Sequence, residues 1–226
     1  MSGKLYLVTT PIGNLQDITL RALDTLKNVD LIAAEDTRRT RQLLSHFDIH
    51  SKLISYHAFN EHGKTDGILQ QIAEGKNIAL VSDAGTPSVA DPGFYLVRAA
   101  LQADLDVEVI PGVSAVTFAV TASALPVDQF SFYGFVPVKS GRKRQFFEEI
   151  KTEQRTVFMF ESPYRVAKTL ELICEVLGED TQISIIREAT KIHEEVITDT
   201  VANVIAKTAD RVWKGEFVIG VYPIKD

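Results

Sequence analysis

The stretch IALVSDAGTPSVADPG, residues 78–93, joins an apolar run to a loop rich in turn-forming residues. The four consecutive apolar residues Ile78–Val81 are typical of a parallel strand that is covered on both faces. Gly85 and Gly93 permit backbone conformations that other residues resist, and two prolines stiffen the loop between them. The stretch therefore predicts a buried strand that ends in a rigid loop, which presents backbone groups and Asp83 to a polar ligand.

The rest of the chain alternates short apolar runs with amphipathic segments, a pattern typical of βαβ units. We expect strands at residues 5–10, 31–35, 53–56, 78–82, 107–110, 130–135, 156–160, 183–187 and 216–222. We expect helices at residues 20–26, 37–47, 65–74, 94–103, 113–124 and 164–177. The pattern predicts an α/β protein of two α/β lobes with mainly parallel sheets, residues 1–112 and 113–226.

Composition narrows the class of protein. Of 226 residues, 45% are hydrophobic and 24% are charged, as in ordinary globular proteins. The formal net charge of −6 argues against a protein that coats nucleic acid by bulk electrostatics alone. No apolar run is long enough to span a bilayer, the N-terminus lacks a signal-peptide layout, and Cys174 is the single cysteine. We therefore expect a cytoplasmic protein with no membrane partner.

Familiar cofactor and metal motifs are missing from the sequence. No predicted strand leads into G-x-G-x-x-G, which leaves a nicotinamide or flavin site without support. Residues 58–65, AFNEHGKT, would match a phosphate-binding P-loop if the first residue were glycine, so Thr65 is interpreted as a helix cap. His57, Glu61 and His62 do not have the H-E-x-x-H spacing. We therefore predict no metal site.

Several predicted strands become polar where they end. In open α/β sheets, ligands bind beyond the carboxyl ends of the strands. Each polar residue taken alone is better explained as a cap of the next helix. Four such ends, in both lobes, favour a shared ligand cleft. These ends are Glu35-Asp36, Ser82-Asp83, Glu161-Ser162 and Arg187-Glu188.

Six motifs together resemble the tetrapyrrole methylase superfamily: SDAGTPSVADPG, PGVSA, AAEDTR, GFVP, ESPYR and REATK. The resemblance covers almost the whole chain and is strongest to the branch that methylates a cytidine 2′-hydroxyl in small-subunit ribosomal RNA. It implies an S-adenosylmethionine-dependent methyltransferase, a homodimer whose cofactor lies in a cleft between the lobes. Carried over by motif, the cofactor-binding residues are Pro11, Asp83, Ala84, Thr86, Ser114, Ala115, Phe160 and Ala189.

Two departures from the wider superfamily favour RNA over a porphyrinoid ring as the substrate. The first loop, TTPIGNLQD, lacks the superfamily's Gly-rich form, and SDAGTP stands where tetrapyrrole enzymes carry a Gly-Gly-Asp-Pro type of loop. Members of the RNA branch often carry an additional C-terminal helical segment, whereas this sequence ends at Asp226. Within the loop of residues 78–93, Asp83 is interpreted as the cofactor's polar anchor and Asp91 as a turn or cap residue.

A ribose hydroxyl is a weak nucleophile, so a base or a positive neighbour that eases its deprotonation would help methyl transfer. The candidates for this role are Glu161, Asp36, Glu188 and Lys191, of which Glu161, Asp36 and Lys191 are the predicted catalytic residues. A salt bridge or a helix cap is the alternative for each.

Clustered cations are candidates for phosphate binding. Arg38 and Arg39 fall in the first turn of a helix capped by Asp36, where positive charge is unfavourable, which suggests that they grip phosphate. The predicted loop KSGRKRQ, residues 139–145, carries four cations in seven residues. The predicted contacts to substrate RNA are Arg38, Arg39, Arg142, Lys143, Arg144 and Arg165.

Three other functions stay open from the sequence. The runner-up is a tetrapyrrole methylase that acts on a ring carbon. A non-enzymatic RNA-binding or assembly factor would not bind S-adenosylmethionine, and a metal-dependent phosphohydrolase would contain metal.

Overall fold

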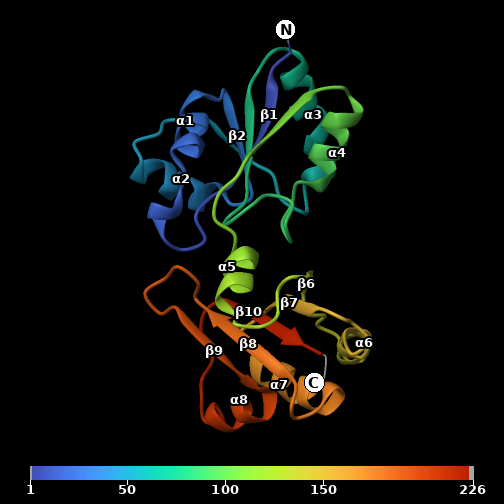
Figure 1. Ribbon diagram of the computed structural model, residues 1–226. Coiled ribbons are helices and arrows are strands. Elements are labelled where there is room, and N and C mark those ends of the chain that lie inside the picture. The colour runs from blue at the N-terminus through green and yellow to red at the C-terminus, as the bar shows by residue number, and fades with distance from the viewer. Residues whose placement is uncertain (1, 224–226) are drawn as a thin grey trace. The chain divides into compact units, whose positions relative to one another are not determined.

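The first sheet of the protein is all-parallel, with the strand order β3-β2-β4-β1-β5 (Figure 1). The computed structural model describes residues 2–223, and the chain divides into two compact units after Ser114. The strands of the first sheet are β1 (Lys4–Val8), β2 (Leu31–Ala34), β3 (Leu53–Ser55), β4 (Ile78–Val81) and β5 (Asp106–Ile110). Every residue of β2 and β4 is buried, as the continuous apolar runs predict for central parallel strands.

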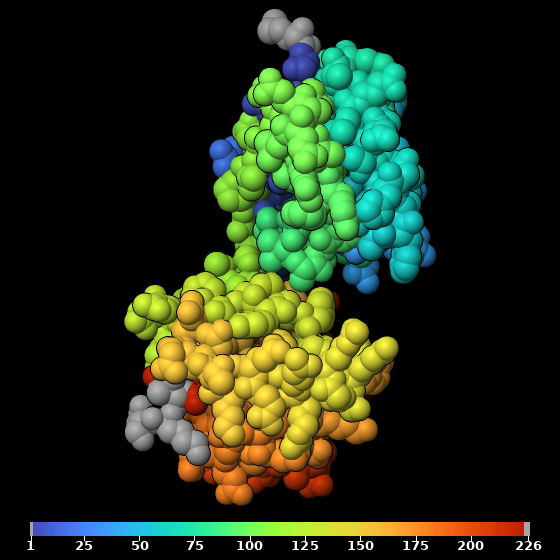
Figure 2. Space-filling view, turned by 90° about the vertical axis from the view of Figure 1, so that its right-hand side faces the viewer, coloured from blue at the N-terminus to red at the C-terminus, as the bar shows by residue number. Residues whose placement is uncertain are grey.

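Helices cover both faces of this sheet (Figure 1). They are α1 (Leu20–Asn28), α2 (Thr37–His46), α3 (Glu61–Ala73) and α4 (Phe94–Gln102), and a short 3-10 turn, η1, spans Leu15–Asp17. One hydrophobic cluster joins α1 and α2 to the sheet through Leu26 and Leu44, and another joins α3 and α4 through Ile72 and Leu96. Figure 2 shows the outer surfaces of α3 (teal) and α4 (green) next to one another.

The second sheet is mixed, with the order β6-β7-β10-β8-β9. Its strands are β6 (Phe130–Phe135), β7 (Thr156–Glu161), β8 (Gln182–Arg187), β9 (Glu195–Thr200) and β10 (Phe217–Tyr222). β10 lies antiparallel to both β7 and β8, and β9 forms an antiparallel pair with β8. Across the two sheets, five of the eight neighbouring strand pairs in the described residues are parallel, which confirms the predicted fold class.

Among the described residues of the second unit there are four helices: α5 (Ala115–Ala122), α6 (Ser140–Ile150), α7 (Val166–Leu177) and α8 (Val201–Lys207). The predicted end of α7 at Gly178 is confirmed by a C-cap with φ 107°, a backbone conformation that favours glycine. The predicted loop at residues 139–145 is wrong, because most of it belongs to α6. That helix forms because Phe146, Phe147 and Ile150 are buried against α7 at helical spacing.

α3 also differs from its prediction. The helix starts at Glu61, four residues before the predicted start, and Asn60 is its N-cap. Thr65 is therefore an interior residue and not a cap, and its buried hydroxyl donates to the Glu61 carbonyl at 2.7 Å. Within residues 2–223, none of the helices has both the length and the apolar character needed to cross a bilayer.

Candidate functional site

The carboxyl ends of β2 and β4 are tied together by two reciprocal hydrogen bonds. The backbone N–H of Asp36 donates to Asp83 Oδ1 at 2.9 Å, and the backbone N–H of Asp83 donates to Glu35 Oε2 at 3.2 Å. β2 and β4 are neighbours in the sheet, so parallel pairing brings these two polar strand ends together. Both carboxylates are therefore fixed by main-chain donors before any ligand binds.

The arginines at the start of α2 are paired with these same acids. Asp36 caps the helix by accepting from the Arg38 N–H at 2.8 Å, and its carboxylate pairs with the Arg38 guanidinium at 2.7 Å. This hydrogen bonding holds the pKa of Asp36 well below its usual value. Arg39 Nη1 lies 3.4 Å from Asp83 Oδ2. The ion pairs offset the unfavourable position of both cations at a helix N-terminus, while most of each side chain stays exposed.

The loop after β4 packs against the loop after β1. Thr10 and Gly85 form an antiparallel bridge with N–H to O distances of 2.9 and 3.0 Å, and the hydroxyls of Thr9 and Thr86 are 3.2 Å apart. Gly85 has φ 80°, which a residue with a side chain rarely adopts. In the first unit the structure thus brings together four of the predicted cofactor-binding residues: Pro11, Asp83, Ala84 and Thr86.

Asp91 lies in the same loop, half-buried. It does not cap α4, whose N-cap is Gly93 and has no side-chain hydrogen bond. Burial, followed by repulsion from Glu35 and Asp83, raises the pKa of Asp91 to about 6, although a hydrogen bond to Ser82 acts in the opposite direction. Three carboxylates therefore surround the end of β4. No group of three or more His, Cys, Asp or Glu that could hold a metal ion is found within residues 2–223.

In the second unit, the end of β7 carries a buried network of charges. The Glu161 side chain is fully buried, and its Oε1 accepts from Ser162 N at 2.7 Å and pairs with Arg165 Nη2 at 2.6 Å. Its Oε2 accepts from the Thr169 hydroxyl at 2.6 Å and lies 3.5 Å from Lys143 Nζ. Every Glu161 oxygen is thus satisfied from inside the protein, so this carboxylate is built to hold its neighbours in place.

Lys143, which the sequence predicts to contact RNA, belongs to this buried network and not to the surface. Lys143 is only 7% exposed, and its ammonium donates to the Thr169 hydroxyl. Burial lowers the pKa of Lys143, whereas Glu161 opposes this shift. Lys143, which the sequence places among the RNA contacts, therefore points inward. No motif in the sequence indicates Thr169, although it lies four residues after Arg165, the N-cap of α7, and so one helical turn from it.

The other cations of α6 stay at the surface. The Arg144 guanidinium pairs with Glu175 of α7 at 2.8 Å. Arg142 is exposed, and no ion pair to it exists among residues 2–223. Arg165 is partly exposed, and its Nη1 donates to the Val136 carbonyl at 3.3 Å. Arg142 is therefore the one predicted contact on α6 whose charge is not already paired in the described structure.

The REATK motif follows β8 in a strained turn. Glu188 and Thr190 have φ values of 50° and 66°, which are uncommon for residues with side chains. Lys191 Nζ lies 2.9 Å from Glu188 Oε1 and 2.8 Å from Glu216 Oε2. Burial lowers the pKa of Lys191, but its two carboxylate partners outweigh this effect and raise it, so the ammonium stays charged at neutral pH. Ala189, between the strained residues, packs on a hydrophobic cluster.

That cluster gathers the remaining predicted cofactor-binding residues of the second unit. Ala115, Phe160 and Ala189 all pack against a core that includes Phe158. Ser114, the last residue of the first unit, directly precedes α5. The three predicted catalytic residues are not brought together by contacts: Asp36 belongs to the first unit, and Glu161 and Lys191 have separate ion-pair partners.

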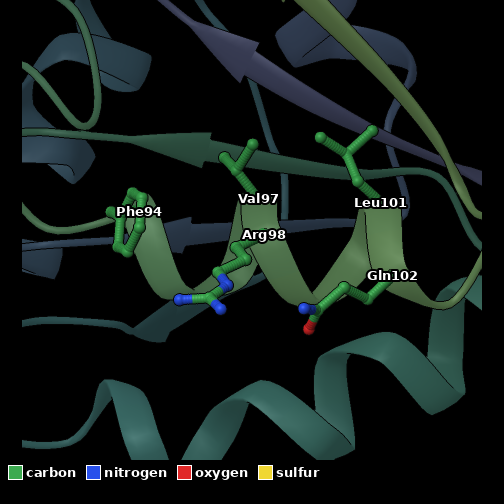
Figure 3. A pocket seen from close by; sticks show the side chains of 5 residues that line it. All are labelled: Phe94, Val97, Arg98, Leu101 and Gln102. Carbon is green, nitrogen blue, oxygen red and sulfur yellow. The ribbon is translucent and has the colours of Figure 1, made fainter.

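A surface groove of about 430 Å³ lies on α4 and is lined by Phe94, Val97, Arg98, Leu101 and Gln102 (Figure 3). All five side chains come from one helix, and only Arg98 carries a charge. The groove offers no acid or base, so it is unsuited to assist a transfer reaction.

Comparison with known proteins gives consistent results. The family model "Tetrapyrrole (Corrin/Porphyrin) Methylases" matches residues 4–205. The chain is 46% identical over 217 residues to the ribosomal RNA small subunit methyltransferase I of Synechocystis sp., covering 96% of this chain and 78% of that protein. It is 46% identical over 219 residues to the protein of the same name from Escherichia coli O157:H7, covering 96% and 77%.

Solved structures share the fold at low identity. Diphthine synthase has a TM-score of 0.76 at 16% identity, covering 97% of this chain and 89% of that one. Uroporphyrin-III C-methyltransferase from Thermus thermophilus, complexed with S-adenyl homocysteine, has a TM-score of 0.65 at 17% identity, covering 98% of both chains.

Proposed function

Because the chain belongs to the tetrapyrrole methylase family, we propose that it is an S-adenosylmethionine-dependent methyltransferase whose substrate is small-subunit ribosomal RNA. The observation that carries the proposal is the 44–46% identity, over 96% of the chain, to proteins named ribosomal RNA small subunit methyltransferase I. The acceptor within this proposal is the ribose 2′-hydroxyl of a cytidine.

The residues of the first unit fit the proposed cofactor. S-adenosylmethionine carries an ammonium and a sulfonium, and the carboxylates of Glu35, Asp83 and Asp91 supply negative charge around the end of β4. The bridge between Thr10 and Gly85 holds the two loops in fixed register, with backbone groups available for hydrogen bonds. Ala115, Phe160 and Ala189 offer apolar surface in the second unit.

When bound, the cofactor supplies an electrophilic methyl group, and a neutral thioether leaves without help from an acid. The protein must then hold the hydroxyl in line at about 3 Å and exclude water. Lys191 stays charged, so we assign it the role of a positive neighbour that stabilises the developing alkoxide. The carboxylate oxygens of Glu161 already accept hydrogen bonds within the protein, so we propose that Glu161 positions Arg165 and does not act as the base. Asp36, with its lowered pKa, is a weak base and serves as the cap of α2.

We also propose the oligomeric state of the chain and the compartment in which it acts. The chain works as a homodimer in the cytoplasm, where it meets small ribosomal subunits; the resemblance of its motifs to the family supports this. Size-exclusion chromatography with light scattering measures the assembly directly, and a mass of one chain, near 25.1 kDa, would contradict the homodimer.

The decisive experiment is methyl transfer by the purified chain. We expect labelled methyl from S-adenosylmethionine to enter small ribosomal subunits and to survive alkaline hydrolysis as 2′-O-methylcytidine. A tetrapyrrole such as uroporphyrinogen serves as the competing acceptor in a parallel reaction. Label in the tetrapyrrole and none in the RNA would contradict the proposal and favour ring-carbon methylation.

A further inference from the structure

Three large apolar side chains are exposed near the ends of β6 and β7. Phe135 is 58% exposed, Val138 is 79% exposed and Tyr164 is 93% exposed. Hydrogen bonds show that the two segments are neighbours: Val136 N donates to the Phe160 carbonyl at 3.1 Å, and Arg165 Nη1 donates to the Val136 carbonyl. Exposed apolar residues are common singly, but side chains of this size gathered at strand ends mark an interaction site.

The turn that carries Tyr164 is held rigidly. Arg165 N donates to the Ser162 carbonyl at 2.9 Å and closes the turn. Glu161, fully buried, binds both ends of it through Ser162 N and the Arg165 guanidinium. Tyr164 is therefore an exposed aromatic ring on an ordered backbone, and binding to it costs little conformational entropy.

The surroundings are positively charged. Residues 135–144 and 162–170 contain six cations and no Asp or Glu, in a chain whose formal net charge is −6. Lys143, Arg144 and Arg165 are paired with Glu161 or Glu175, which leaves three cations outside the ion pairs of residues 2–223. Lys139 and Arg142, at the start of α6, and Lys168, in the first turn of α7, are exposed. The hydrogen bond from Lys143 to Thr169 and the ion pair of Arg144 with Glu175 join α6 to α7, so the cations at the starts of these helices belong to a common region.

We propose that this surface, which we name the aromatic platform and define as Phe135, Val138, Lys139, Arg142, Tyr164 and Lys168, binds a single-stranded segment of the RNA substrate, with Tyr164 stacked on an unpaired base. The inference rests on the proposed function. Sequence-specific proteins read RNA mainly where bases are unstacked, and aromatic rings beside cations are the side chains that hold such bases. An enzyme that acts on a ribose within folded RNA needs such a hold on the strand.

Binding of a labelled oligocytidylate, followed by fluorescence anisotropy at several salt concentrations, tests the platform. Tyr164→Ala should weaken binding about 5- to 150-fold, the range expected for one lost base–aromatic stack. Tyr164→Phe keeps the ring and should bind like the original chain. Phe59→Ala removes another aromatic side chain, 99% exposed in the first unit, and is the matched control without effect. Because Tyr164 is so exposed, none of these changes should lower the melting temperature.

Salt dependence separates stacking from phosphate binding. Tyr164→Ala should leave the slope of log Kd against log salt unchanged, whereas Arg142→Ala should reduce its magnitude by about 0.7. With small ribosomal subunits as acceptor, Tyr164→Ala should raise KM in the same proportion as Kd. If Tyr164→Ala left Kd and KM unchanged, the proposed role of the aromatic platform would be wrong. It would also be wrong if Tyr164→Ala converted a dimer to a monomer, because the Tyr164 ring would then contact a second copy of the chain.

The two proposals fail in different ways. Methyl transfer by the original chain to small subunits, with Tyr164→Ala equally active at all substrate concentrations, overturns the platform alone. Binding of RNA that depends on Tyr164, without methyl transfer by the original chain, supports the platform and contradicts the proposed reaction.

Discussion

Replacing Glu161 by glutamine tests whether the buried network at the end of β7 organises the second unit. The substitution keeps the size of the side chain and removes its charge. Arg165, at 2.6 Å, and Lys143, at 3.5 Å, would then lose their common counter-ion. The Lys143 ammonium is hardly accessible to water, so solvation cannot replace the lost partner.

The expected loss of stability follows from the burial of the Glu161 ion pairs. Breaking a buried ion pair by removing one partner costs about 3–5 kcal/mol, because a charge stays buried without compensation. For a protein of this size, each kcal/mol lowers the melting temperature by about 2–4 °C, so we expect a decrease of about 6–20 °C. Glu175→Gln is the matched control: it removes a carboxylate that pairs with Arg144 at the surface of the same unit, and we expect no measurable change.

Differential scanning calorimetry and methyl transfer are measured on the same preparations. Lys143→Met, added to Glu161→Gln, should restore part of the lost stability, since a buried cation is then replaced by an apolar side chain. A Glu161→Gln chain that melts like the original would refute the reasoning. If it also lost methyl transfer at unchanged KM, Glu161 would act on the hydroxyl directly rather than through Arg165.

Three further predictions concern other sites. Asp91→Asn removes a carboxyl whose pKa rises from 3.8 to about 6 on folding, so the original chain loses stability as pH rises through this window. Solvent screening of the half-buried group reduces the effect, and we expect the variant to be about 1 kcal/mol more stable than the original chain at neutral pH. At about pH 4 the variant should be no more stable than the original chain, and urea denaturation measures both values. Gly93→Ala should destabilise by about 1–3 kcal/mol in the same assay, because φ is 138° and a Cβ would lie 2.6 Å from Ser88 Oγ. Lys191→Met should lower kcat for methyl transfer about 100-fold with little change in KM, whereas Lys191→Arg should retain most of the rate; equal rates for both variants would contradict the assigned role.

Much of the first unit follows from local sequence. The four apolar residues of β4 and the four of β2 are buried as predicted, because a central parallel strand needs apolar side chains on both faces. Parallel pairing then fixes which polar residues meet, so the approach of Asp36 to Asp83 follows from strand order alone. The pairing of Arg39 with Asp83 does not, since it depends on the direction of a long side chain.

The second unit was harder to predict because its elements depend on distant contacts. The cations of α6 obscured the helical spacing of Phe146, Phe147 and Ile150. The inward orientation of Lys143 depends on Glu161, which is eighteen residues away in the sequence. The sequence does not predict β9, because only alternate residues of an edge strand face the core and its sequence EVITDT lacks a continuous apolar run.

The distribution of charge explains how a chain of net negative charge can bind RNA, which is also an anion. In the first unit, Glu35, Asp83 and Asp91 concentrate negative charge at the end of β4, and burial, followed by repulsion from Glu35 and Asp83, raises the pKa of Asp91. A positively charged cofactor would relieve that repulsion, whereas a phosphate would increase it. In the second unit, the segments at residues 135–144 and 162–170 contain no acid. Because exposed charges act over about 10 Å at ordinary salt, these local clusters, and not the net charge of −6, decide which ligand each surface accepts.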